Sequence, residues 1–299
     1  GSLFERAIYG AGSPMGSVWT PELVAQVDRD MLLDFHRREI TPDNMTVFMI
    51  GDIGIEEATR VVERSFGKWR ADAASGRKPI GEARSKAPRV ILVDHPEAPQ
   101  STIHAGHALP PYDPDTSTEL HIMNGVFGGG FEARINMNLR EDKHWSYGMS
   151  SGIQQNMSGD QYIAVSGSVQ TDKTMESMQE IMKEFEEFVT TRPATETEVS
   201  RVKINRTRSL PGTFSTNRGF LASIMTSDSY GLPFDHAETV DERIDAVTTE
   251  GVNSRARETI DPDKLTWVVV GDLAEIEDKV RSLGYGEVEV WDAFGNRVR

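Results

Sequence analysis

Residues 40–52 read ITPDNMTVFMIGD, and residues 260–272 read IDPDKLTWVVVGD. The two stretches align without a gap, because the Pro-Asp turn, the threonine before the apolar run and the closing Gly-Asp fall at the same places. A self-match of this kind indicates a duplicated structural unit. Since an uninterrupted apolar run follows the turn in each copy, each copy predicts a buried strand.

Helical patterns flank the first copy. Thr20 and Pro21 form a helix-start signal, and apolar residues recur at helical spacing as far as residue 35. A second helical pattern covers residues 55–66. We therefore expect helix, a strand at 46–50, then helix. The same order should recur at the end of the chain and close by about residue 287.

The region between the copies has strands and helices of its own. Residues 71–88 are small, polar and rich in Gly and Pro, which is typical of a linker. Strand patterns follow at 89–94, 101–107, 146–155 and 161–169, and helical patterns at 116–127, 131–141, 175–188 and 195–210, the last ending at Leu210, Pro211 and Gly212. We interpret residues 1–70 as the carboxyl-terminal half of one module and residues 89–290 as a complete one. The chain is then expected to be part of a larger repeated protein.

Composition excludes several classes of protein. The net charge of −15 and the pI near 5.0 argue against a general nucleic-acid binder, whose affinity comes from clustered Lys and Arg. No apolar run approaches the ~18 residues that a membrane helix requires. The chain has no cysteine, so disulfides, thiolate metal sites and a cysteine nucleophile are excluded.

Patterns that would give this chain catalysis of its own are missing. A helix that binds zinc through two histidines carries His-Glu-x-x-His or the inverse His-x-x-Glu-His, and neither occurs. His104 and His107 lie three apart in an expected strand, so they should point to opposite faces. No Ser, His and acid stand in an arrangement typical of a catalytic triad. We predict neither a catalytic residue nor a metal site here.

The triple glycine at 128–130 precedes the short predicted helix, whose amino-terminal amides could hold an anion. No Lys-Ser or Lys-Thr accompanies it, so a tight turn that allows close packing is the better interpretation. Gly128, Gly129 and Gly130 stay a weak candidate for a loop in a substrate cavity.

Arg140 and Tyr147 are the stronger candidates. Arg140 lies at a predicted helix end and Tyr147 at the start of the next strand, so both should project to one side of that junction. A guanidinium and a phenol can donate hydrogen bonds to a peptide carbonyl, or to an oxyanion that develops from it. On spacing alone, such a pair more often anchors a surface turn.

The region around this pair resembles the M16 metallopeptidase family, the group of insulinase, pitrilysin and mitochondrial processing peptidase. Its later modules carry GGG-x-x-x-R leading into N-L-R-E-x-x-x-x-x-Y-G, and the matching residues here are Gly128, Gly129, Gly130, Arg134, Asn138, Leu139, Arg140, Glu141, Tyr147 and Gly148. Further similarity lies in YGAGSPMGSVWT, ITPDNMTVFMIGD, SVQTDKTMESM and RSLPGTF, so it covers nearly the whole chain. The last two resemble the carboxyl-terminal half of long bacterial zinc proteases, in which two M16 pairs are fused in tandem.

The resemblance implies an α+β fold in which each module is a mainly antiparallel sheet with helices packed on one face. It implies zinc-assisted peptide hydrolysis by four modules that enclose a peptide chamber, with the zinc motif in the first module. This chain lacks that motif, so Zn²⁺ is expected only in the intact enzyme. Arg140 and Tyr147 match the pair that late modules direct at the peptide. The implied partners are a peptide substrate and amino-terminal catalytic M16 modules, on the same chain or a partner subunit.

The leading hypothesis is the non-catalytic, substrate-contacting, carboxyl-terminal part of an M16 zinc endopeptidase. The alternative is a catalytically inactive M16 homologue that serves as a structural or partner-binding subunit, and a His-x-x-Glu-His motif upstream or in a partner discriminates the two. A third hypothesis, a stand-alone hydrolase, predicts peptide turnover by this chain that chelators do not abolish. A periplasmic or cell-envelope location in a bacterium is suggested only by the resemblance.

Overall fold

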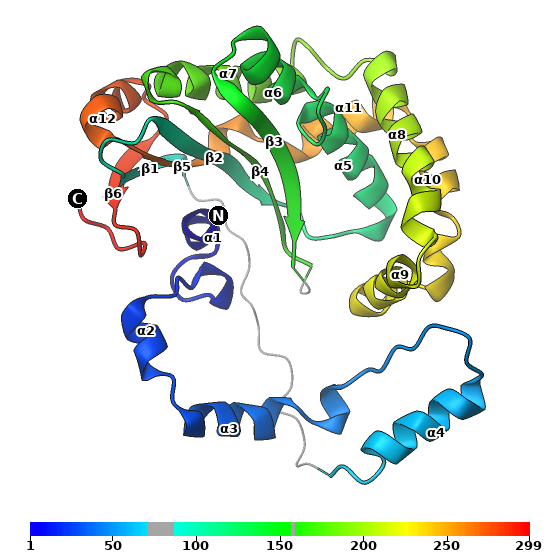
Figure 1. The fold of residues 1–299 in the computed structure, drawn as a ribbon. Helices are drawn as coiled ribbons and strands as arrows, with labels where there is room; N and C mark the ends of the chain where they lie inside the picture. The colour runs from blue at the N-terminus through cyan, green and yellow to red at the C-terminus, as the bar shows by residue number, and fades with distance from the viewer. Residues whose placement is uncertain (71–86, 157–158) are drawn as a thin grey trace. The chain divides into compact units, whose positions relative to one another are not determined.

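The computed structural model describes residues 1–70, 87–156 and 159–299 (Figure 1). These residues form two compact units. The larger unit contains the described residues of 1–18, 80–208 and 239–299, and the smaller one those of 19–79 and 209–238. The expected linker at 71–88 lies almost entirely outside the described residues. The division into 1–70, 71–88 and 89–290 therefore stays a prediction.

A six-stranded sheet forms the centre of the larger unit. Its strands lie in the order β3-β4-β2-β5-β1-β6. β3, β4, β2 and β5 pair antiparallel, whereas β1 is parallel to both β5 and β6, so the sheet is mainly antiparallel, as expected. The strands are β1 (Arg89–Asp94), β2 (Gln100–Leu109), β3 (Ser146–Gln155), β4 (Gln161–Gln170), β5 (Thr266–Gly271) and β6 (Glu287–Trp291).

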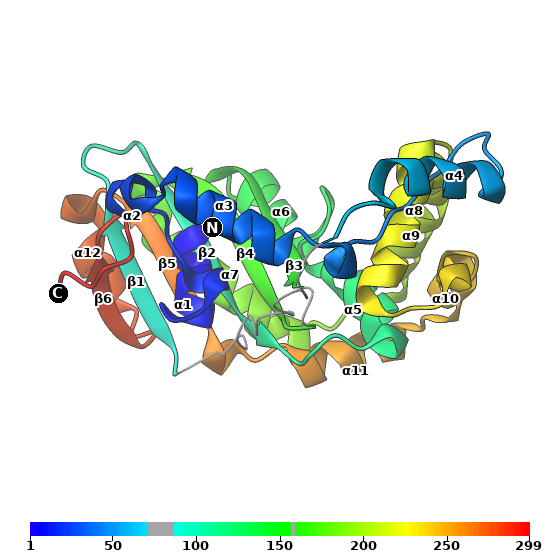
Figure 2. The ribbon, with the colours of Figure 1, turned by 90° about the horizontal axis from the view of Figure 1, so that it is seen from below.

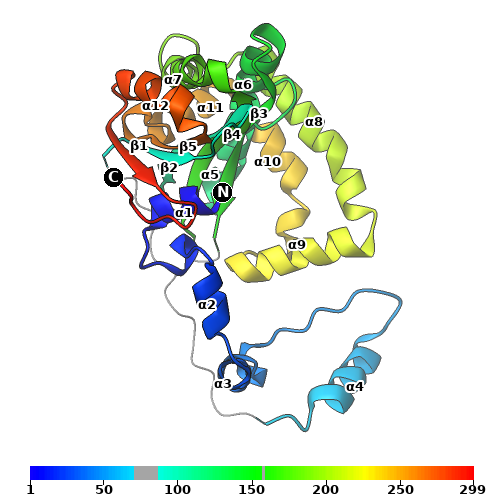
Figure 3. The ribbon, with the colours of Figure 1, turned by 60° about the vertical axis from the view of Figure 1, so that its left-hand side comes forward.

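Most helices of this unit cover one face of the sheet, and α1 (Ser2–Tyr9) covers the other, as Figures 1 and 3 show. This arrangement confirms the α+β fold expected for the module, with helices packed mainly on one face, and adds a helix from the start of the chain on the other face. The remaining helices are α5 (Pro114–Phe127), α6 (Arg134–Asn136), α7 (Thr174–Val189), α8 (Glu196–Phe214), α10 (Val240–Ala246), α11 (Thr249–Thr259) and α12 (Leu273–Ser282). The short 3-10 turns are η1 (Pro14–Gly16), η4 (Thr171–Lys173) and η6 (Pro262–Lys264), and η3 (Met137–Asp142) is a π-helix.

Helix α1 explains why β1 and β5 are apolar at nearly every position. Phe4 and Ile8 of α1 pack in one buried cluster with Ile91 of β1 and Val268 of β5. The alternate residues, such as Trp267, are buried toward the other helices. Strands covered on both faces read as continuous apolar runs rather than as alternating ones. Burying side chains of this size stabilises the fold by about 2 kcal/mol each.

The helical layer is packed through aromatic and small residues. Phe127 at the end of α5 lies 4.7 Å from the Phe185 ring and 5.3 Å from the Phe188 ring, both on α7. At Gly125 of α5, a Cβ would come within 2.6 Å of Val202 on α8, so only glycine allows this approach. The apolar stripe at helical spacing in residues 175–188 thus marks a core-facing helix, as predicted.

The smaller unit is helical. It contains α2 (Pro21–Gln26), α3 (Arg29–Glu39), the turn η2 (Pro42–Asn44), α4 (Ile55–Phe66), α9 (Asn217–Tyr230) and η5 (Phe234–Ala237), together with the end of α8. Figure 2 shows the same elements from below. The prediction of a strand at 46–50 is wrong, because these residues form neither strand nor helix. Backbone groups in a strand need a neighbouring strand to bond to, and none of the described residues pairs with this stretch.

Helix α8 also differs from its prediction. It was expected to end at Leu210–Gly212, but it continues through Pro211 to Phe214. Proline removes one helical hydrogen bond, a loss that costs less where water can reach the freed carbonyl. Pro211 is exposed in the structure. No helix in the described part of the chain combines the length and apolar character needed to cross a membrane.

Candidate functional site

A π-helix carries the candidate Arg140. The predicted short helix at 131–141 is resolved into one turn of α-helix, α6, followed by the π-helix η3. The wider ring is visible where the Lys143 amide donates to the Asn138 carbonyl five residues earlier, at 3.0 Å. Such widened turns are rare and frequently lie at functional sites. No residue pattern in the sequence predicted this π-helix.

The structure brings Arg140 and Tyr147 together. The guanidinium carbon of Arg140 lies 5.4 Å from the centroid of the Tyr147 ring, and only 4.5 Å from that of Phe131. Arg140 Nε pairs with Glu141 at 3.2 Å. Among the described residues its two terminal nitrogens have no hydrogen-bond acceptor, and neither does the Tyr147 hydroxyl. The pair therefore presents free donors on one side of the junction between η3 and β3.

A β-bulge makes Tyr147 project outward. Ser146 pairs with Val169 and Gly148 with Ser168, so Tyr147 is the extra residue on β3. The Ser146 hydroxyl stabilises the bulge, since it donates to the Ser168 carbonyl at 2.8 Å and accepts from the Gly148 amide at 3.0 Å. Tyr147 is 88% exposed. Bulges commonly re-aim a side chain next to functional sites.

Phe131 belongs to this cluster, although sequence reasoning missed it. It was placed within the predicted helix, where an aromatic residue is expected to face the core. Instead it lies before α6 and is 59% exposed, with its ring against Arg140. Phe131, Arg140 and Tyr147 together are called the aromatic–arginine cluster below. The only signal for Phe131 was its place directly after the triple glycine.

The triple glycine closes the edge of the sheet. β3 is an edge strand, and the Gly128 carbonyl accepts from the Ser151 amide at 2.8 Å. A Cβ at Gly128 would lie 2.4 Å from Ser151 Oγ, so this approach requires glycine. The amides of Gly128 and Gly129 both donate to the Asn124 carbonyl, at 2.9 and 2.8 Å. These two amides are already used, which favours the close-packing interpretation; a role for Gly128–Gly130 in a substrate cavity stays a prediction.

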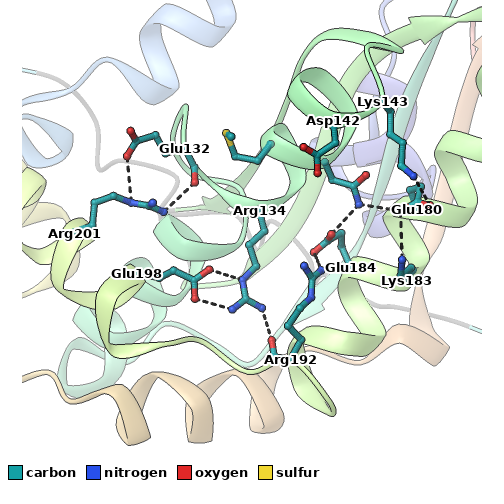
Figure 4. A pocket seen from close by; sticks show the side chains of 12 residues that line it. Glu132, Arg134, Asp142, Lys143, Glu180, Lys183, Glu184, Arg192, Glu198 and Arg201 are labelled. Atoms are coloured by element: carbon teal, nitrogen blue, oxygen red, sulfur yellow. Dashed lines mark hydrogen bonds and ion pairs between the residues drawn. The ribbon is translucent and has the colours of Figure 1, made fainter.

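A charged pocket lies on the other side of η3, between α7 and α8 (Figure 4). It has a volume of about 390 Å³ and is lined by five acidic and five basic side chains. Most of these are paired, and the buried Glu184 accepts from both Asn138 and Arg192. These interactions tie η3 to α7 through Asn138 and tie α6 to α8 through Arg134 and Glu198. Because the charges are balanced, the pocket has little net charge for a ligand.

Arg134 is the structural centre of that network. Its guanidinium makes two bonds of 2.7 Å to Glu198 and donates to the carbonyls of Arg192 and Pro193. Burial would raise the pKa of Glu198, but hydrogen bonds from Arg134 and Thr195 lower that pKa to about 2. Thr195 and Glu198 also form the predicted capping box. The Arg134 side chain of the sequence motif thus stabilises the fold.

The histidines do not form a metal site. His104 lies beside Phe4 and accepts from the amino group of Gly1, whereas His107 on the opposite face accepts from the Asp261 amide. Burial lowers the pKa of both imidazoles, that of His104 to about 4. Across residues 1–70, 87–156 and 159–299, no three His, Asp or Glu side chains are arranged to hold a metal ion. The residues that the structure describes therefore do not fit a zinc site.

Residues 148–152, GMSSG, fit the spacing Gly-x-Ser-x-Gly, which can mark a serine nucleophile. The nucleophile requires a sharp strand-to-helix turn. Here Ser150 lies within β3, paired with Ser166 of β4. The stretch is therefore an ordinary strand segment.

Comparison with known proteins agrees with this geometry. Residues 26–206 match the model of the peptidase M16 inactive domain. An uncharacterized zinc protease of Mycobacterium leprae (strain TN) is 26% identical over 159 residues, which are 51% of this chain and 35% of that protein. The matched part of this chain thus spans about a third of that relative's length.

Solved structures share the fold. The peptidase M16 inactive domain from Pseudomonas fluorescens superposes with a TM-score of 0.80 at 18% identity, covering 91% of this chain and 65% of that one. The periplasmic protease PqqL from Escherichia coli superposes with a TM-score of 0.72 at 14% identity, covering 91% of this chain and 30% of that one. Since the family model covers more than half of the chain, the chain belongs to the peptidase M16 family and carries its inactive domain, related to zinc proteases.

Proposed function

We propose that this chain is the substrate-contacting, zinc-free part of an M16 endopeptidase that hydrolyses peptides. The observation that carries the proposal is the aromatic–arginine cluster, in which Arg140 and Tyr147 present free hydrogen-bond donors beside each other. Arginine keeps its charge at any physiological pH and has five donors in a planar fork. The two side chains are suited to hold a peptide carbonyl.

The same donors can favour the transition state. When a peptide bond is hydrolysed, negative charge develops on the carbonyl oxygen, and donors fixed in advance stabilise it more than they stabilise the ground state. Removing one donor of this kind typically lowers turnover ~100-fold or more. Arg140 is partly shielded by two rings and 31% exposed, so its charge acts with less screening than that of a free surface arginine.

Zinc would come from another module. In zinc peptidases the bound metal polarises the peptide carbonyl, and the described residues here do not form a site for it. We infer that amino-terminal M16 modules, on the same chain or a partner subunit, supply the metal and the general base. A periplasmic or envelope location is proposed by analogy with the periplasmic protease PqqL.

The test is turnover of a peptide by the assembled enzyme with substitutions in this chain. Arg140→Ala and Tyr147→Phe should each lower kcat by ~100-fold with smaller changes in KM, because their donors act mainly on the developing oxyanion. Arg201→Ala is the matched control, since Arg201 pairs with Glu132 in the charged pocket and is outside the cluster. Normal turnover in both cluster variants would refute the proposal.

The purified chain alone gives a second test. We expect it to cleave no peptide, with or without chelator. If the chain hydrolysed peptides in the presence of chelator, the stand-alone hydrolase hypothesis would replace the proposal. If the assembled protein contained no zinc motif, the structural or partner-binding alternative would replace it.

A further inference from the structure

Asn136 joins the two chain segments that flank Arg140. It lies in α6, and its side chain is only 5% exposed. Its Nδ2 donates to the Phe131 carbonyl at 2.7 Å, and its Oδ1 accepts from the Met149 amide at 3.1 Å. One side chain thus ties the loop before α6 to strand β3.

These two bonds fix the backbone on either side of the aromatic–arginine cluster. The first bond is to Phe131 itself. The second reaches β3 just past the bulge, two residues after Tyr147. The two rings that lie against the guanidinium therefore belong to segments that Asn136 holds together.

The cluster needs such an anchor. An exposed cation–π contact contributes less free energy than ordering the backbone of a single residue costs. Phe131 and Tyr147 are 59% and 88% exposed, so little other packing orders them. Contacts of the rings with Arg140 cannot by themselves fix the orientation of the guanidinium. Backbone anchoring by the buried amide of Asn136 can fix this orientation.

We propose that Asn136 is a positioning residue, which holds Phe131 and Tyr147 against the Arg140 guanidinium so that Arg140 meets the peptide in one orientation. Asn136 itself touches no substrate. The inference rests on the proposed function of Arg140 and Tyr147, and it adds Phe131 to that site as a side support of the guanidinium.

Asn124 provides a matched control on the same edge of β3. Its Oδ1 accepts from the Ser151 hydroxyl at 2.6 Å and its Nδ2 donates to the Ser151 carbonyl at 3.3 Å. Asn124→Ala thus removes the same kind of side-chain link from the same strand. It leaves the bonds of Asn136 in place.

The first experiment uses NMR on this chain. Stacked rings shift the Arg140 Nε–H signal away from its random-coil position. We expect the shift to persist in Asn124→Ala and to collapse in Asn136→Ala. Asn136→Asp, which keeps the acceptor for Met149 but loses the donor to Phe131, should lose only part of it. An unchanged Arg140 signal in both Asn136 variants would overturn the inference.

The second experiment is a double-mutant cycle in the assembled peptidase. We expect Asn136→Ala to lower kcat roughly 10-fold, because misplacing a catalytic group costs rate even when the group is present. The same change in an Arg140→Ala/Tyr147→Phe background should cost nothing further, since Asn136 acts through these two side chains. A loss that adds fully to that of the Arg140→Ala/Tyr147→Phe variant would overturn the inference. Normal turnover of both Arg140→Ala and Tyr147→Phe would instead refute the proposed function, and the NMR result would still decide the role of Asn136.

Discussion

The stretches 41–51 and 261–271 carry the same pattern, but they form different structures. In the second stretch the apolar run is β5, which lies between β1 and β2 and is almost fully buried. In the first stretch the equivalent run, residues 46–50, forms no strand, and Val47 and Met49 are each 42% exposed. The turn before the run is a Pro-Asp 3-10 turn in both.

An apolar run therefore forms a strand only where neighbouring strands bond to its backbone. β5 has a parallel partner on one side and an antiparallel partner on the other, so its backbone groups are bonded along both edges. The run at 46–50 lines an open apolar groove of about 500 Å³ together with Ile53, Ile55 and Val62. An exposed apolar surface of this kind is typical of an interface.

Hydrogen exchange should show the largest contrast between the two stretches. Amides of residues 267–270 should exchange ~1,000-fold or more below their intrinsic rates, because they open only with the whole unit. Amides of residues 47–50 should exchange within about tenfold of intrinsic rates. Mass spectrometry on peptides from both stretches measures this. Equal protection would show that residues 46–50 find strand partners in solution.

Charged substitutions at equivalent positions of the two stretches should differ almost as much in their effect on stability. Val269→Asp places a carboxylate in the sheet core, where the residue is fully buried, and should lower the free energy of unfolding by about 4 kcal/mol. Met49→Asp, at the matching position of the first copy, should change it by less than about 0.5 kcal/mol. Urea denaturation followed by fluorescence compares the two. Similar losses in both would contradict the structure of the first copy.

The larger unit, which contains the second stretch, should also lose stability in acid. Burial, and then the nearby amino group of Gly1, lower the pKa of His104 in β2 to about 4. The unfolded chain takes up this proton near pH 6.5 and the folded chain only near pH 4, so stability should fall as the pH drops through this window. His104→Gln should flatten the dependence of Tm on pH between 6.5 and 4. An unchanged slope would assign it to other groups.

The smallest contrast concerns the aspartates that close the two stretches. Asp272 caps α12 by accepting from the Ala274 amide at 3.1 Å, and it also accepts from the Glu97 amide at 3.0 Å. Asp272→Ala should therefore cost about 1 kcal/mol. Asp52 precedes a helix that begins after Gly54 without a side-chain cap, so Asp52→Ala should cost nothing measurable. Thermal unfolding of both variants tests this, and a comparable loss from Asp52→Ala would show a cap that the structure lacks.

The sequence predicted much of the larger unit because its elements have local signals. Helical spacing located α7, the Thr195 and Glu198 pair located the start of α8, and apolar runs located β1 and β5. Prediction from the sequence failed where the local structure depends on partners that are distant in the chain. The run at 46–50 has the right residues and no neighbouring strand, and α8 passes Pro211 because its end is exposed.

The candidate site was predicted in part. Their places at a helix end and at the start of the next strand predicted that Arg140 and Tyr147 project to one side of that junction, and the guanidinium carbon lies 5.4 Å from the Tyr147 ring centroid. The π-helix, the bulge at Tyr147, the exposed ring of Phe131 and the link through Asn136 had no recognisable signal. Each arises from hydrogen bonds between segments that are separate in sequence.

Sequence patterns alone located the repeat, strands β1 to β5, helix α7 and the resemblance to M16 peptidases, because periodicity, capping and motif residues are local properties of the chain. They did not predict β6, which lies where the last helix was expected to close the unit. Tertiary contacts determine which copy of the repeat becomes a strand, which motif residues hold the fold and which stay exposed. Arg134 and Arg140 illustrate this, since one is buried against Glu198 and the other is presented beside Tyr147. Burial and partner geometry, which set the free energy of each side chain, exist only once the chain has folded.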